Sequence, residues 1–86
     1  MSTISQIKQQ VNQIAQSASS AAQQLTQLAT KLEQNSAAVN AAIGDTSSGE
    51  DKTIAAAFLQ ASKSVKDAAS QLQAASQAAK NWANKA

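Results

Sequence analysis

The stretch Ile43-Gly44-Asp45-Thr46-Ser47-Ser48-Gly49 decides the fold of this 86-residue chain. It holds the only two glycines of the sequence, and the chain contains no proline. Glycine and proline are the residues that most often interrupt regular structure, so their restriction to one short segment indicates a single interruption. The sequence therefore predicts one turn over residues 44–48, with Gly44 and Gly49 as its turn residues, between two long regular elements.

Both segments that flank this turn repeat apolar residues at alternating intervals of three and four. This spacing is typical of the heptad seam of packed helices, and a disordered polar tract has no reason to keep it on both sides of a turn. We therefore expect helices over residues 3–43 and 49–84. The predicted seam contains Ile4, Ile7, Val11, Ile14, Ala18, Ala21, Leu25, Leu28, Leu32, Val39 and Ala42, then Ile54, Phe58, Ala61, Val65, Ala68, Leu72, Ala75, Ala79 and Trp82.

The predicted helix ends carry suitable capping residues. Ser2 or Thr3 can accept hydrogen bonds from the first free N–H groups, and Gly44 can adopt the left-handed conformation that often follows a helix. Acidic side chains near the start of the second helix complement its positive end. Two pairs also have the spacing of a capping box, namely Ser47 with Glu50 and Ser48 with Asp51.

A turn this short makes the two helices antiparallel neighbours, so the predicted fold is an all-α hairpin in a single domain, residues 1–86. Large residues face small ones if paired residue numbers sum to about 93, as for Ala61 with Leu32 and Ala68 with Leu25. A sum near 97 is the alternative. A chain of this size builds only a small core, so we expect dimerisation or partner binding to complete a four-helix bundle.

Composition excludes most chemistry. The chain has no Cys, His, Arg or Tyr, seven Lys and five acidic residues, with a net charge of +2. These residues offer no activated nucleophile, no disulfide and no soft metal ligand, so we expect no enzyme activity, cofactor or metal. The acids of the turn do not follow the calcium-loop pattern, and helix capping accounts for them.

Scattered lysines and two aromatic residues argue against nucleic-acid binding. No run of about 18 apolar residues exists, so we expect neither a signal peptide nor membrane insertion.

A second row of small residues runs beside the predicted seam and suggests a docking surface for another helix. Alanine is also the best helix former and tolerates exposure, which is the alternative interpretation of this row. Ile4 and Ile7 extend to the end of the hairpin, where their side chains would be partly uncovered. The candidate partner-binding residues are Ile4, Ile7, Ala15, Ala22, Ala29, Ala69, Ala78 and Trp82.

Two residues of the predicted seam have two interpretations each. Trp82 either closes the core over Val11 and Ile14 or anchors a partner, since Trp is frequent among binding hot spots. Asn35 interrupts the apolar seam, where a buried polar residue can set register or oligomeric state. Alternatively, Asn35 lies near the tip of the hairpin, is solvated, and specifies nothing.

The architecture resembles the early-secreted-antigen, or Trp-x-Gly, type of small helical hairpin exported by bacterial type VII secretion. The resemblance rests on two long helices, the absence of Cys and a central turn in which Gly44 matches the family's glycine. That turn has no Trp. Trp82 takes the place of the aromatic residue in the family's export motif, and Ala86 stands where the family has an acid.

The resemblance implies a non-enzymatic protein that pairs through its helices as a homodimer or heterodimer. It would act as a secreted partner or targeting chaperone of a larger helical protein, such as the targeting domain of a toxin. The resemblance further implies secretion without a cleavable signal peptide, or a bacterial cytoplasmic location before export. The alternative function is that of a structural or assembly hairpin, such as a coat, scaffold or granule-surface protein.

Overall fold

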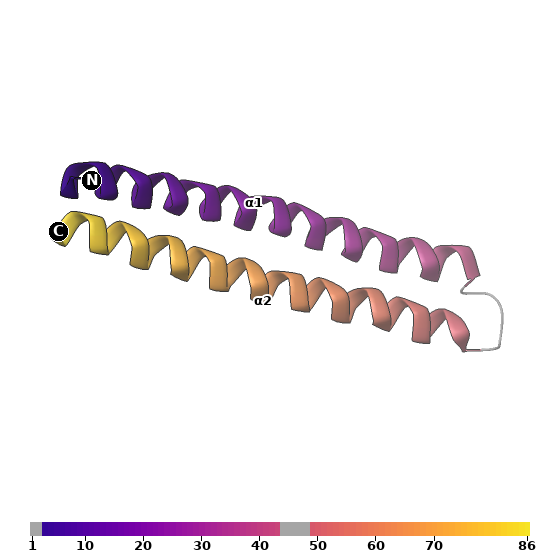
Figure 1. Ribbon diagram of the computed structural model, residues 1–86. Helices are drawn as coiled ribbons and strands as arrows, with labels where there is room; N and C mark the ends of the chain where they lie inside the picture. Colours follow the sequence, from indigo (N-terminus) through magenta and orange to yellow (C-terminus); the bar gives the residue numbers. More distant parts are fainter. Residues whose placement is uncertain (1–2, 44–48) are drawn as a thin grey trace.

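The computed structural model describes residues 3–43 and 49–86. Two helices, α1 (Ile4–Ile43) and α2 (Glu50–Lys85), run antiparallel and side by side, so both ends of the chain lie at the same end of the molecule (Figure 1). The hairpin is long and thin, with principal extents of 66, 18 and 13 Å. Both helices begin one residue later than predicted, and α2 ends one residue later.

The first helix starts with a reciprocal capping box. The backbone N–H of Gln6 donates to Thr3 Oγ1 at 3.2 Å, and the backbone N–H of Thr3 donates to Gln6 Oε1 at 2.9 Å. Each bond satisfies a backbone donor that has no partner within the helix. Thr3 therefore fills the capping role predicted for Ser2 or Thr3, and Gln6 completes the box.

The second helix begins from a glycine. Gly49 occupies the position before α2 with a φ of 79°, a left-handed conformation that glycine adopts readily. The serine caps predicted from Ser47 and Ser48, and the cap predicted from Gly44, lie outside the described residues. Glu50 and Asp51 fall in the first turn of α2, where negative charge complements the helix dipole.

The contact between the helices consists of small side chains. Every seventh residue is buried along each helix, and we call this set the small-residue column. No large side chain is fully buried anywhere in the described part of the chain. The column comprises Ala15, Ala22, Ala29 and Ser36 on α1, and Ala55, Ser62, Ala69, Ser76 and Ala83 on α2.

Three serines of the column hydrogen-bond directly to the backbone of the opposite helix. Ser76 Oγ donates to the Ala15 carbonyl at 2.8 Å, Ser36 Oγ to Ala55 at 3.0 Å, and Ser62 Oγ to Ala29 at 3.1 Å. A hydroxyl one bond beyond Cβ reaches a neighbouring backbone only when two helices approach closely. The residue numbers of each pair sum to 91, so the register differs from both predicted sums, 93 and 97.

The predicted seam is not the centre of the contact. Ile14, Leu28, Ile54 and Trp82 were expected in the core, yet their exposed fractions are 64%, 44%, 42% and 45%. Large side chains facing each other directly would hold two helices apart, whereas alanine and serine allow close approach and the serine–carbonyl bonds. Each helix is therefore rotated about its axis relative to the prediction, and its large apolar residues flank the contact.

Candidate helix-binding face

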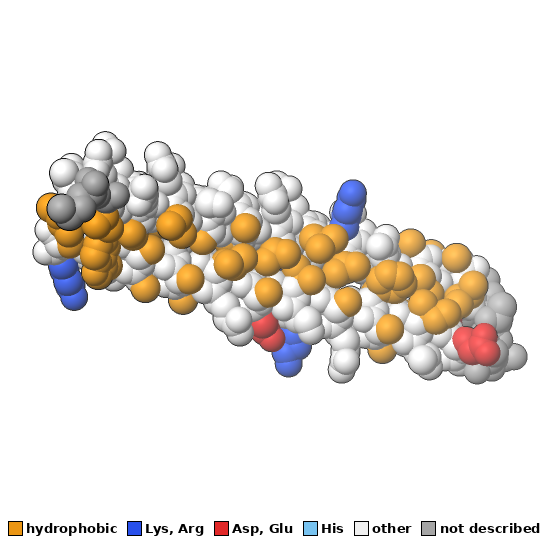
Figure 2. Space-filling model, in the orientation of Figure 1, with side chains coloured by type: hydrophobic (Ala, Val, Ile, Leu, Met, Phe, Trp, Pro, Cys, Tyr) orange, Lys and Arg blue, Asp and Glu red, His pale blue; other side chains and the backbone are white. Residues whose placement is uncertain are grey.

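Most large apolar residues of both helices lie on the same side of the hairpin; Leu59, which is 52% exposed, is on the other side, four positions after buried Ala55. A residue four positions before a buried one is displaced by about 40° around the helix, and a residue one position before it by about 100°. Because the helices are antiparallel, residues that precede a buried residue by four or by one position lie on the same side of the hairpin in both helices. Figure 2 shows the result as a continuous hydrophobic band along the length of the molecule.

Four rows of residues make up this side, which we call the apolar face. The inner rows border the small-residue column, and their large side chains are half-buried except for that of Ile4, which is exposed. The outer rows lie farther from the contact. The inner rows are Ile4, Val11, Ala18, Leu25, Leu32 and Val39, and Phe58, Val65, Leu72 and Ala79; the outer rows are Ile7, Ile14, Ala21, Leu28, Asn35 and Ala42, and Ile54, Ala61, Ala68, Ala75 and Trp82.

The apolar face is largely uncovered in the hairpin. Ile14 and Leu28 on α1, and Ile54 and Trp82 on α2, each expose more than two-fifths of their surface. Ile4 is 57% exposed at the end where the chain termini meet. Monomeric proteins rarely expose contiguous apolar patches of more than a few hundred Å², and larger ones mark interaction sites. A band that runs the length of a 66 Å molecule is one of these larger patches and therefore marks an interaction site.

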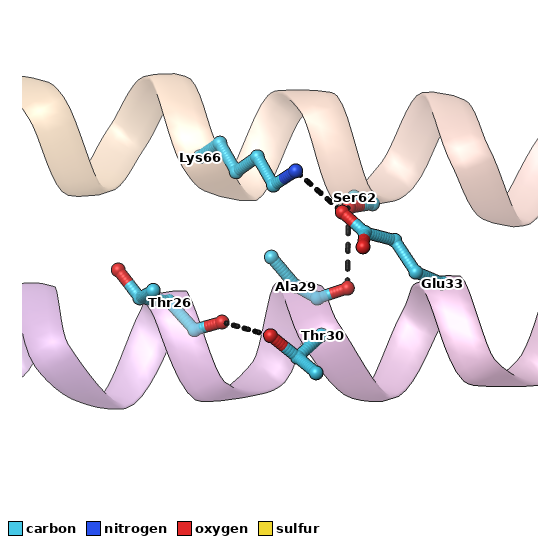
Figure 3. Close-up of polar contacts among 6 residues, drawn as sticks. All are labelled: Thr26, Ala29, Thr30, Glu33, Ser62 and Lys66. Carbon is cyan, nitrogen blue, oxygen red and sulfur yellow. Dashed lines mark hydrogen bonds and ion pairs between the residues drawn. The ribbon is translucent and has the colours of Figure 1, made fainter.

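The opposite side of the hairpin is mostly polar and holds an ion pair between the helices. Lys66 Nζ contacts Glu33 Oε1, and Ser62 Oγ lies 3.1 Å from the same oxygen (Figure 3). Ser62 also donates to the Ala29 carbonyl, and because its hydroxyl has one hydrogen it serves one acceptor at a time.

The pair perturbs the titration of the glutamate. Hydrogen bonds from Lys66 and Ser62, together with the charge of Lys66, lower the pKa of Glu33 below its ordinary value of 4.5. The Lys66 and Glu33 side chains are 57% and 41% exposed, so solvent screens the pair and its effect on stability is small. This side is therefore a solvated surface that carries the Lys66–Glu33 pair between the helices.

Four of the predicted partner-binding alanines lie inside the hairpin. Ala15, Ala22, Ala29 and Ala69 are at most 7% exposed, because they form the small-residue column. The structure therefore assigns them to the contact between the two helices and not to an outer docking surface. The physical reason is the rotation of the helices described above.

The remaining candidates divide into two groups. Ile4, Ile7 and Trp82 all belong to the apolar face, at the end of the hairpin that carries the termini. With 45% of its surface exposed, Trp82 is not a buried plug over Val11 and Ile14. Ala78 is exposed but lies two positions after buried Ser76, about 200° around α2, and so points away from both α1 and the apolar face.

Some residues of the face were missed as candidates because they were assigned to the core. Leu28 and Ile54 are exposed members of the outer rows. Asn35 is exposed in an outer row, so it is not a buried register-setting residue of this hairpin. The signal that identifies the true contact is the seven-residue repeat of alanine and serine, which hydrophobic periodicity overlooks because serine counts as polar.

Other kinds of site find no support in the described residues. No group of three or more acidic, His or Cys side chains there is arranged to hold a metal ion. Neither described helix has a stretch apolar enough to cross a bilayer.

The fold and the face define a class of protein: a two-helix hairpin with one polar side and one uncovered apolar side. Comparison with protein-family models, with curated proteins and with solved structures finds no match. The functional argument therefore rests on the face itself.

Proposed function

We propose that this chain is a non-enzymatic helix-binding protein that packs its apolar face against two helices of a partner and so completes a four-helix bundle. The observation that carries the proposal is the exposure of Ile14, Leu28, Ile54 and Trp82 on one continuous face. Burying a large apolar side chain fully contributes about 1.5–3 kcal/mol, so covering each of these half-exposed residues contributes roughly 1 kcal/mol.

The shape of the face favours a helical partner. It is long and narrow, it follows two antiparallel helices, and its side chains repeat with the heptad periodicity that fits the ridges of other helices. No lysine and no acidic residue falls in its four rows, and Asp51, which precedes the inner row of α2 near the turn, is buried. An uncharged face without a deep cleft fits a packed helix better than a small charged ligand.

The narrower proposal is that the partner belongs to type VII secretion, with the chain acting as a secreted partner or targeting chaperone. The resemblance to the Trp-x-Gly hairpins supports it through the shared architecture and Gly44. The position of Trp82 within α2 on the apolar face, with 45% of its surface exposed, supports a role in partner contact. Secretion predicts that the intact chain, with its N-terminus unprocessed, accumulates in the culture medium of the producing bacterium, as mass spectrometry of the medium would detect.

Site-specific photocrosslinking tests the binding proposal. A benzophenone amino acid replaces Leu28 on the apolar face, and the matched control replaces Gln23, an exposed residue on the same helix outside that face. Both proteins are irradiated in the producing cells, and the linked peptides are identified by mass spectrometry. We expect efficient links from position 28 to helical segments, either of another protein or of a second copy.

The control decides what a positive result means. Position 23 should give few links, because it faces away from the apolar face. Equal yields from both positions, or no links from position 28, would overturn the proposed function.

A further inference from the structure

We propose that the partner on the apolar face is a second copy of this chain, related to the first by a twofold axis parallel to the long axis of the hairpin. This inference rests on the proposed function and names the occupant of the same face. In this arrangement α1 of each copy packs on α2 of the other, and the termini of both copies lie at one end of the bundle.

The size of the face matches the needs of a stable dimer. A face of 66 by 18 Å projects about 1,200 Å² per copy, compared with roughly 800 Å² per partner in a standard protein interface. Because the four rows lack lysines, two copies can meet there without like-charge repulsion even though each carries a net charge of +2. The lysines of both copies stay outside the interface.

Two pairs of outer-row side chains favour this axis. At the register of the hairpin, Ile14 lies near the height of Ala75, and Leu28 near the height of Ala61. When α1 packs on α2 of the second copy, each of these large side chains therefore faces an alanine. Large against small at facing positions fills an interface without voids.

The alternative twofold axis, perpendicular to the long axis, matches the side chains poorly. It places α1 on α1 and α2 on α2, head to tail. The outer row with Ala61, Ala68 and Ala75 would then pack on itself along α2, while the outer row with Ile7, Ile14 and Leu28 would pack on itself along α1. Small side chains would leave gaps in the interface along α2, and large side chains would be crowded along α1.

The proposed axis also suits the helix dipoles. Each helix then has two neighbours, its own hairpin partner and one helix of the second copy, and both run antiparallel to it. Opposite dipole ends therefore lie next to each other at both ends of the bundle. The same axis brings Ile7 of one copy to the height of Trp82 of the other, where both gain cover.

The first test is the mass of the purified full-length chain by sedimentation equilibrium across a range of concentrations. We expect a dimer of twice 8.8 kDa. Leu28→Gln should weaken the dimer by about tenfold or more, because a dimer carries two copies of the change at a packed position. Gln23→Ala, on the same helix but away from the face, should leave the dissociation constant unchanged.

Cysteine pairing tests the axis, since the chain has no cysteine of its own. A disulfide needs Cα atoms within about 7 Å, so it forms only between residues that truly face each other. Mixing Ile14→Cys with Ala75→Cys should give a disulfide-linked dimer after mild oxidation. Mixing Ile14→Cys with Leu28→Cys should not. Both replaced positions of the first pair are exposed in the hairpin, so the substitutions leave its folding intact.

The outcomes separate this inference from the proposed function. Preferential linkage of position 14 to position 28 overturns the proposed axis. A chain that stays monomeric, while photocrosslinks from position 28 land on another protein, overturns the second copy as partner and leaves helix binding intact. A monomer without such photocrosslinks overturns both.

Discussion

The substitution Ala22→Leu tests the packing that underlies the whole hairpin. Ala22 is 1% exposed and lies in the small-residue column, where the register of 91 places it opposite Ala69, itself 7% exposed. A leucine adds three carbon atoms where two helices are in close contact. The helices must separate locally, and the nearest serine–carbonyl bonds, Ser76 to Ala15 and Ser62 to Ala29, must lengthen.

The expected loss of stability follows from these contacts. Overpacking a close contact costs about 1–3 kcal/mol, and each weakened hydrogen bond costs up to about 1 kcal/mol. The free energy of unfolding should therefore fall by roughly 2–4 kcal/mol. For a chain of this length, that corresponds to a decrease in Tm of about 10 °C or more.

Thermal and urea unfolding followed by circular dichroism measure this loss, at one fixed protein concentration because self-association raises apparent stability. Ala78→Leu is the matched control, since it adds the same atoms at an exposed position of α2 and should change stability by less than about 0.5 kcal/mol. If Ala22→Leu were neutral or stabilising, the small-residue column would not be the contact between the helices, and the originally expected seam would regain support.

Three further predictions concern the hydrogen bonds, the turn and the ion pair. Ser76→Ala removes the 2.8 Å bond to the Ala15 carbonyl and should cost about 1 kcal/mol in urea unfolding, whereas Ser70→Ala at an exposed site should cost nothing measurable. Gly49→Ala places a Cβ at a φ of 79°, where no atom lies within 4 Å, so it should cost about 1 kcal/mol from backbone strain without a clash. Glu33 has a pKa below its ordinary value in the folded state, so its stabilising effect is present above pH 4.5 and is lost as the pH falls through the lowered pKa. Glu33→Gln should remove that small acid-dependent loss from urea midpoints measured between about pH 6 and pH 2.

Each of these three has a result that would contradict it. Equal destabilisation by Ser76→Ala and Ser70→Ala would show that the bond across the helices contributes nothing specific. A stabilising Gly49→Ala would mean that the residue is not held in the left-handed conformation. If the urea midpoint of Glu33→Gln fell with decreasing pH as much as that of the unchanged protein, the pH dependence would come from another carboxylate.

The number, length and order of the helices could be read from the sequence because they depend on local properties. Gly44 and Gly49 are the only glycines, and the apolar periodicity on both sides, which lapses once at Asn35, leaves no other place for a turn. The capping role of Thr3 was likewise local, since it needs only an acceptor next to the first free N–H groups.

The direction in which each helix faces could not be read in the same way. Hydrophobic periodicity marks the side of a helix that avoids water, but it does not say whether that side meets the other helix of the hairpin or another molecule. Two helices alone cannot both pack closely together and cover large residues such as Ile14 and Leu28, which stay exposed.

The sequence by itself thus determined an all-α hairpin with an apolar side, and its composition predicted the absence of catalytic chemistry. Only the tertiary structure showed that alanine and serine at every seventh position form the contact and set the register at 91. The reason is physical: a hydroxyl such as that of Ser76 can donate a hydrogen bond to a backbone carbonyl of the opposite helix only when small side chains let the two helices come close. That close approach leaves the large residues on the outside, where they form the face that we propose binds the partner.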